Sequence, residues 1–386
     1  MKRFVVLGGT GDMGRFVVKD LFESCKNCEI VIGARDFDEV KKYANSFKSK
    51  RVIPKKIDVT NIKETAKILK GASVCINCVN YYFNLDVMKA CLLVRCHYLD
   101  LGGLYHMTKR QLKLNNQFKR KKLIAILGCG ATPGITNIMI AHASKFFEKI
   151  ESIDIRFGGY DWTKYKQHFV LPYTAYTLFD EFTDNPIVFK DGKTISVKPM
   201  TGKDYYNFPK PVGKQSCFYT LHSELATIPN IYKNKGLKNC SFRVCFPEDF
   251  VHDVNLLIEL GFASKQKIKI GNIELTPRDF AAKELNREAL PKDVKIKDME
   301  FIWVDLIGTK KDKKIKVSMY SYAKSNPKWN APAGSVDTAV PPSIIAQMIA
   351  NKQVKEKGVL PPEKCINPKL FFKELKKRNI KISKRI

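Results

Sequence analysis

Hydrophobic runs alternate with helical spacings along the first third of the chain. Runs typical of buried strands lie at residues 2–7, 29–33, 51–57, 73–77, 97–100 and 123–127. Between them, apolar residues recur at helical spacing, as in residues 15–22, 37–47, 62–69 and 84–94. Strands that alternate with helices in this way predict an α/β fold with a doubly wound parallel sheet.

The pattern changes after residue 132. Strands are expected at residues 153–157, 187–198, 216–220 and 241–246, followed by a hairpin at 301–308 and 314–323. With helices expected at 250–262 and 277–286, this region predicts a second, α+β domain with a largely antiparallel sheet. We place the first domain at residues 1–132, the second at 133–330, and helices that pack back on the first domain at 331–386.

A glycine-rich motif connects the first strand to the first helix. The segment that fits G-x-G-x-x-G is Gly9-Thr10-Gly11-Asp12-Met13-Gly14. In this context the glycines make a tight turn, let the backbone approach a pyrophosphate and let the helix pack closely on the strand. Free N–H groups and the positive dipole end of the helix favour phosphates. The segment therefore predicts a Rossmann dinucleotide site.

The end of the second strand bears on the choice of cofactor. An NAD site usually carries an acid about 20 residues past the glycines, where it binds the ribose 2′-OH. Ala34 takes that position here, with Arg35 next to it. A missing carboxylate removes repulsion of a 2′-phosphate, and a guanidinium offers it a planar fork. The sequence favours NADP(H), while NAD stays possible because Asp36 could bind the ribose instead.

Parallel strands bring their carboxyl ends to one rim of the sheet, where ligands bind. Cofactor contacts are expected at the ends of the third and fourth strands, from Asp58, Val59, Asn77, Cys78, Val79 and Tyr81. Thr132 suits a helix N-cap with Pro133 in the first turn. Alternatively, Thr132 and Asn137 could reach the nicotinamide amide or a substrate carboxylate.

Charge and cysteine content are the unusual features of the composition. The 386 residues carry a formal net charge of +30, but the lysines are spread in short groups without a nucleic-acid motif. Nucleic acid is therefore an unlikely partner, and the charge favours anionic substrates and phosphorylated cofactors by steering. We expect a cytoplasmic protein without a membrane span. The eleven cysteines show no spacing that supports a metal site or disulfides.

Several segments together resemble the saccharopine dehydrogenase family, in the branch with lysine 6-dehydrogenases. Besides the glycine motif, the similar segments are residues 77–84, 97–103, 130–134, 222–229 and 358–363. The resemblance implies a Rossmann domain, a substrate and dimerisation domain, and a homodimer. It also implies oxidation of a carbon–nitrogen bond of an amino acid, or reduction of an imine to build one.

The cofactor argument favours a saccharopine dehydrogenase-like enzyme of lysine metabolism that prefers NADP. The alternatives are a lysine 6-dehydrogenase, an imine-reducing enzyme of polyamine synthesis, and a non-catalytic NADP-binding sensor with affinity for polyanions.

Candidate catalytic groups follow from the need to manage the proton of the substrate amine. Asp100, with Tyr98 beside it, ends the fifth strand at the expected rim. His222 lies near Glu224, and a neighbouring carboxylate can tune an imidazole to work around neutral pH. For substrate binding we expect Asn137, Tyr173, Glu224 and Arg243. Arg243 lies between apolar residues of a strand, where it needs an anion: a substrate carboxylate or an internal salt bridge.

Overall fold

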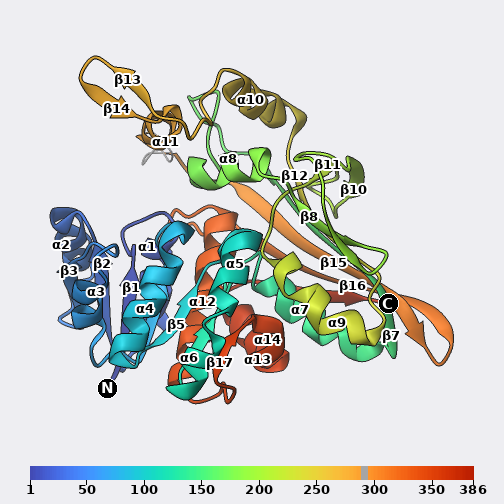
Figure 1. Cartoon of the computed structure of the whole chain (residues 1–386), viewed down its shortest axis with the longest axis horizontal. Helices are drawn as coiled ribbons and strands as arrows, with labels where there is room; N and C mark the ends of the chain where they lie inside the picture. The colour runs from blue at the N-terminus through green and yellow to red at the C-terminus, as the bar shows by residue number, and fades with distance from the viewer. Residues whose placement is uncertain (288–293) are drawn as a thin grey trace.

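Two β-sheets organise the chain in a computed structural model that describes residues 1–287 and 294–386 (Figure 1). Within these ranges the first sheet has seven parallel strands in the order β17-β6-β5-β4-β1-β2-β3. Their bounds are β1 Lys2–Leu7, β2 Cys28–Ala34, β3 Val52–Lys56, β4 Val74–Asn77, β5 His97–Asp100, β6 Ile124–Ile126 and β17 Gly358–Leu360. The strand order reverses between β1 and β4, which is the place where a doubly wound sheet binds its ligand.

Helices cover both faces of the first sheet because its strands are apolar on both sides. Along β1, Phe4 and Val6 face one hydrophobic core, and Val5 and Leu7 face another. The helices that connect these strands are α1 Gly14–Ser24, α2 Phe37–Ser46, α3 Ile62–Leu69, α4 Asn84–Val94, α5 Leu104–Leu112 and α6 Asn115–Arg120. Helices α1 and α2 contribute to the first core, and α3, α4 and α6 contribute to the second. The predicted α/β fold is confirmed, while α5 and α6 were not expected.

The second sheet is mixed and has nine strands among the described residues. Its main path runs β10-β11-β12-β7-β15-β16-β18, and β12 pairs with β7 in parallel while the other neighbours on this path are antiparallel. The bounds are β7 Lys149–Asp161, β8 Ile187–Lys190, β9 Lys193–Ser196, β10 Asp204–Asn207, β11 Lys214–Tyr219, β12 Asn239–Cys245, β15 Asp298–Lys310, β16 Lys313–Lys324 and β18 Lys381–Arg385. The single strand expected at 187–198 is the hairpin β8–β9, which turns at Gly192 with a positive φ of 77°.

Further helices lie around this sheet, with α8, α10 and α11 grouped near the hairpin β13–β14 (Figure 1). The bounds of these helices are α7 Ile135–Ala143, α8 Ala175–Thr183, α9 Ile228–Tyr232, α10 Glu248–Glu259 and α11 Pro277–Arg287, and the hairpin consists of β13 Ile268–Ile270 and β14 Ile273–Leu275. Helix α7 starts after Gly134, whose N–H donates to Oδ1 of Asn137 at 3.0 Å. The expectation that Thr132 caps this helix is therefore wrong, because the first helical turn lies farther along the chain.

The last part of the chain belongs to both sheets. Helix α12 (Ala333–Ala350) contacts α1 and β4 on one side and β15 and β16 on the other. After it, β17 extends the first sheet and β18 extends the second. The helices α13 (Pro362–Cys365) and α14 (Pro368–Lys377) lie between these two strands in the sequence. Helices were expected here, but the two strands were not.

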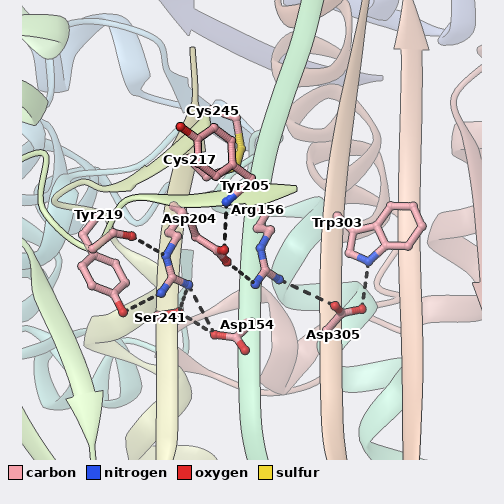
Figure 2. A network of polar contacts seen from close by, with 12 residues as sticks. Asp154, Arg156, Asp204, Tyr205, Cys217, Tyr219, Ser241, Cys245, Trp303 and Asp305 are labelled. Atoms are coloured by element: carbon pink, nitrogen blue, oxygen red, sulfur yellow. Dashed lines mark hydrogen bonds and ion pairs between the residues drawn. A yellow bond between two sulfur atoms is a disulfide. The ribbon is translucent and has the colours of Figure 1, made fainter. Parts of the chain in front are cut away.

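The structure also corrects the interpretation of the cysteines. Cys217 on β11 lies directly opposite Cys245 on β12, and the two form a disulfide (Figure 2). Their separation of 28 residues carries no disulfide pattern, because only the strand register brings them together. Among the described residues, no group of three metal-ligating side chains forms a candidate metal site. No helix in the described ranges is long and apolar enough to cross a membrane.

Candidate active site

The glycine motif forms the turn from β1 into α1, and its geometry requires glycine. A Cβ atom on Gly14 would lie 2.1 Å from the carbonyl oxygen of Gly8, and one on Gly9 would lie 2.8 Å from the Ile32 side chain. The helix therefore packs directly on the turn, and no side chain caps its start at Met13. Asp12 and Met13 line a cavity of about 1000 Å³. The glycine turn and the start of α1 together fit the pyrophosphate of a dinucleotide.

The residues after β2 fit a phosphorylated ribose. Arg35 is exposed and lines the same cavity. Asp36 instead caps α2, since its Oδ1 accepts the backbone N–H of Glu39 at 3.0 Å. Because Asp36 already serves as a cap and Ala34 carries no acid, the charged group at this position is a guanidinium. The arrangement suits a 2′-phosphate. Asp58 binds Thr60 in a turn beyond β3, with Val59 buried next to it.

The loop after β4 contributes to the cavity wall. Cys78, Val79 and Tyr81 line it, whereas Asn77 is buried below the rim and donates to Oδ1 of Asn84 at 2.8 Å. The hydroxyls of Tyr81 and Tyr82 both donate to Asp180 of α8, at 2.6 Å each. The loop therefore joins the first domain to the second at the cavity.

Asp100 and Tyr98, expected as catalytic groups, lie in the core of the first domain. Asp100 is 1% exposed and accepts hydrogen bonds from the Gly128 N–H at 2.7 Å, the Tyr98 hydroxyl at 2.8 Å and the Gln111 amide at 2.6 Å. Neither Asp100 nor Tyr98 is among the residues that line the cavity. The carboxylate instead ties β5 to the loop after β6. The expected catalytic role is not supported, because these internal partners occupy the oxygens.

His222 takes part in a buried acid–base cluster that faces the cavity. Its Nδ1 lies 2.5 Å from Oε2 of Glu224, and its Nε2 lies 4.0 Å from Oε1 of Glu181. The ring stacks on Phe242, with centroids 3.8 Å apart. The Tyr173 hydroxyl donates to Glu181, and His222, Glu181 and Tyr173 all line the cavity. The structure thus brings together three expected residues and adds Glu181.

Burial and neighbouring charges shift the pKa values of the acid–base cluster. Burial raises the pKa of Glu181 to about 7, although the charge of His222 opposes this rise. Burial alone would lower the pKa of His222, but the carboxylates of Glu224 and Glu181 raise it above its ordinary value. A carboxyl group that can hold or release a proton near pH 7, beside an imidazole, is suited to general acid–base catalysis.

A chain of buried hydrogen bonds supports the cluster from behind. The Thr136 hydroxyl lies 2.9 Å from Oε1 of Glu224 and 3.1 Å from Oδ1 of Asn137, and its single proton can be donated to either acceptor. The Asn137 amide donates to Glu363 at 2.9 Å, and the Thr227 hydroxyl donates to the other oxygen of Glu363. Asn137 and Glu224, expected to bind substrate, lie outside the cavity lining. They hold His222 in place, while Thr132 does line the cavity.

Arg243 lies on the other face of the second sheet. Its neighbour Phe242 lines the cavity under His222, and alternation along β12 turns Arg243 the opposite way. There Arg243 pairs with Asp154 at 3.7 Å and donates to Ser241 at 3.0 Å, in the region of Figure 2. The expected contact with a substrate carboxylate is therefore not supported, and the internal salt bridge is what the structure shows.

The wall of the cavity is acidic. The acids that line it are Asp12, Asp161, Glu181, Asp249, Asp253, Asp279, Asp298 and Glu300. Arg35 is the only lysine or arginine among the lining residues that the structure describes. The sequence predicts a basic surface that favours anionic substrates, but the charged residues that line the cavity of this strongly basic chain are mostly acids.

These features define the class of protein. A Rossmann sheet with a glycine turn, a guanidinium at the ribose position and a buried acid–base cluster belong to an NAD(P)-dependent oxidoreductase. Residues 4–126 match the family model described as the saccharopine dehydrogenase NADP binding domain, and residues 130–380 match the saccharopine dehydrogenase C-terminal domain. The chain therefore belongs to the saccharopine dehydrogenase family, as a dehydrogenase that acts on CH–NH groups and binds NADP. The family assignment favours an enzyme over a non-catalytic sensor.

Individual relatives are distant. The chain is 24% identical over 285 residues to carboxyaminopropylagmatine dehydrogenase of Synechocystis, with 72% of this chain and 70% of that protein covered. It is 21% identical to carboxynorspermidine synthase of Vibrio cholerae, with 63% of this chain and 62% of that protein covered. Saccharopine dehydrogenase (L-Glu forming) of Saccharomyces cerevisiae has a similar fold, with a TM-score of 0.76, 15% identity, and coverage of 100% of this chain and 99% of that one.

Proposed function

We propose that this enzyme reduces an imine in polyamine synthesis, with NADPH as the hydride donor and a substrate that carries several cationic groups. The observation that carries this proposal is the acidic cavity in a chain whose net charge is +30. A cavity lined by one sign of charge concentrates ligands of the opposite sign. Two relatives whose names describe carboxylated polyamines support this substrate class.

In this proposal the cavity divides into a cofactor end and a substrate end. The glycine turn at Gly9–Gly14 holds the pyrophosphate, Arg35 binds the 2′-phosphate, and Asp58 and Val59 lie beside the adenosine. Cys78, Val79, Tyr81 and Thr132 surround the nicotinamide and its ribose. The reduced nicotinamide supplies hydride to the imine carbon. Tyr173 contacts the substrate.

His222 and Glu181 manage the proton of the reaction. When hydride reaches the imine carbon, the imine nitrogen must take up a proton to give the secondary amine. Protonated Glu181 or His222 donates it from the buried cluster, and Glu224 keeps the imidazole oriented. In the oxidative direction the same groups remove that proton. Phe242, stacked under the ring, excludes water from one side of the imidazole.

The test is a substrate panel run with NADPH and NADH in parallel. In the reductive arm, an amino acid with a side-chain aldehyde is paired with agmatine, 1,3-diaminopropane or 1,4-diaminobutane. We expect NADPH oxidation with at least one of these pairs and formation of a secondary amine. In the oxidative arm, saccharopine and lysine are offered with NADP⁺ and NAD⁺. Turnover of saccharopine or lysine alone would overturn the polyamine assignment and favour lysine metabolism.

A further inference from the structure

An acid in the cavity wall, Glu300, and a buried acid near it, Asp337, have no assigned role. Glu300 lies on β15, on the same face as Ile302 and Val304, and lines the cavity. Behind it, Asp337 of α12 is 1% exposed. The charges of Asp337, Asp298 and Asp161 act on Glu300, so that acids from β7, β15 and α12 meet here.

One oxygen of each carboxyl group lacks a hydrogen-bond partner, although the Asp337 side chain also has a hydrogen bond with Thr338. Oε2 of Glu300 and Oδ1 of Asp337 are buried without a hydrogen-bond partner. The neighbouring Asp298 differs, because its two oxygens accept the Ala333 N–H at 3.0 and 2.8 Å and cap α12. Burying carboxyl oxygens without a donor is unfavourable. Since no ion pair to Glu300 or Asp337 occurs within the described ranges, the missing partner can come from a ligand.

Two glycines leave space for the Glu300 side chain. A Cβ atom on Gly334 would lie 2.7 Å from Oε1 of Glu300, and one on Gly159 would lie 2.7 Å from its Cγ. Gly334 and Gly159 both line the cavity as well. Larger residues at either position would displace the carboxyl group, so the backbone is shaped to admit it.

We propose that Glu300 forms a subsite for a second cationic group of the substrate, a primary ammonium or a guanidinium, and that Asp337 adds negative charge from the buried side of Glu300. Tyr173 connects this subsite to the acid–base cluster, because its hydroxyl binds Glu181 and it also interacts with the charge of Glu300. A substrate held by Glu300 at one cationic group can thus present another nitrogen near His222. The inference rests on the proposed function in one respect, namely that the substrate is a diamine or polyamine.

Calorimetric titration of the NADP⁺-loaded protein tests the subsite without turnover. The probes are 1,4-diaminobutane and butylamine, which share a carbon chain and differ in one ammonium group. We expect wild-type protein to bind the diamine at least ten times more tightly. Glu300→Gln and Asp337→Asn should each weaken diamine binding about tenfold or more and change butylamine binding less than twofold. Glu259→Gln, an exposed acid of α10, should change neither.

Unfolding of the variants provides the check on their fold. Because an amide needs no counter-ion, Glu300→Gln and Asp337→Asn should unfold at or above the wild-type temperature. Equal binding of the two amines by wild-type protein, or an unchanged preference in both variants, would overturn the subsite. That result would leave the proposed function intact if polyamine turnover is seen. Conversely, a preference lost in the variants would support the subsite even if no imine is reduced.

Discussion

Replacing Asp180 with asparagine should loosen the junction between the two domains. Asp180 of α8 is fully buried and accepts the hydroxyls of Tyr81 and Tyr82 from the first domain. It also pairs with Arg278 of α11 at 2.8 Å and with Lys265 at 3.0 Å. Burial opposes ionisation of Asp180, but these hydroxyls and the charge of Arg278 lower its pKa below the ordinary value.

The expected loss follows from what remains after the substitution. The Arg278 side chain is only 4% exposed, so Asp180→Asn leaves a buried guanidinium without a counter-ion. Breaking a buried ion pair in this way costs about 3–5 kcal/mol. The pH dependence has a definite sign. Because folding lowers the pKa of Asp180, its contribution is present above the unfolded pKa and is lost as the pH falls through the folded pKa.

Urea unfolding of wild type and variants measures this loss. The matched control is Asp184→Asn, whose partly exposed carboxylate pairs with the same Lys265 at 3.5 Å. Surface pairs of this kind contribute about 0–1 kcal/mol. A loss for Asp180→Asn that is no larger than that of the control would refute the assignment of Asp180 as a buried inter-domain anchor.

Three further substitutions probe the cofactor and the proton path. Arg35→Ala should weaken NADPH binding by about 10- to 100-fold, as expected for a charged hydrogen bond, and leave NADH binding nearly unchanged. Equal losses of NADPH and NADH affinity in fluorescence titrations would contradict the assignment of Arg35 to the 2′-phosphate. With the pKa of Glu181 raised to about 7, imine reduction should fall as the pH rises through 7, and Glu181→Gln should remove this limb from the kcat/KM profile. Asp100→Asn should lower the free energy of unfolding by about 1–3 kcal/mol with kcat of the folded enzyme unchanged; a normal stability with reduced kcat would return Asp100 to the mechanism.

Local patterns predicted the first domain well because its strands and its glycine turn depend on neighbouring residues. Continuous apolar runs mark β1, β2 and β4, since both faces of that sheet are covered. The segment Gly9–Gly14 was placed between a strand and a helix, where the structure has it. Cofactor binding depends mostly on such local geometry.

The substrate end could not be predicted in the same way, because it depends on which face a side chain occupies. Asp100 ends a strand at the rim where ligands bind, but its side chain faces the core. Arg243 comes directly after Phe242 in β12, so its side chain lies on the face of the sheet away from the cavity. Glu181 and Glu300 reach the same cavity, with Asp337 near Glu300, only after distant parts of the chain fold together. A weak pattern did exist, since each of these acids has at least one apolar neighbour in the sequence, and a buried acid usually has a specific partner.

The closing segment of the chain has a consequence for attempts to dissect the enzyme. Because β17 completes the first sheet and β18 the second, with α12 packed against both, a fragment that ends at residue 132 would lack its seventh strand and one helical cover. A fragment that starts there would retain β17 without a sheet to join. The two domains therefore cannot be exchanged between relatives at a single junction. A functional chimera needs three junctions, so that β17 and β18 each come from the same protein as the sheet they join.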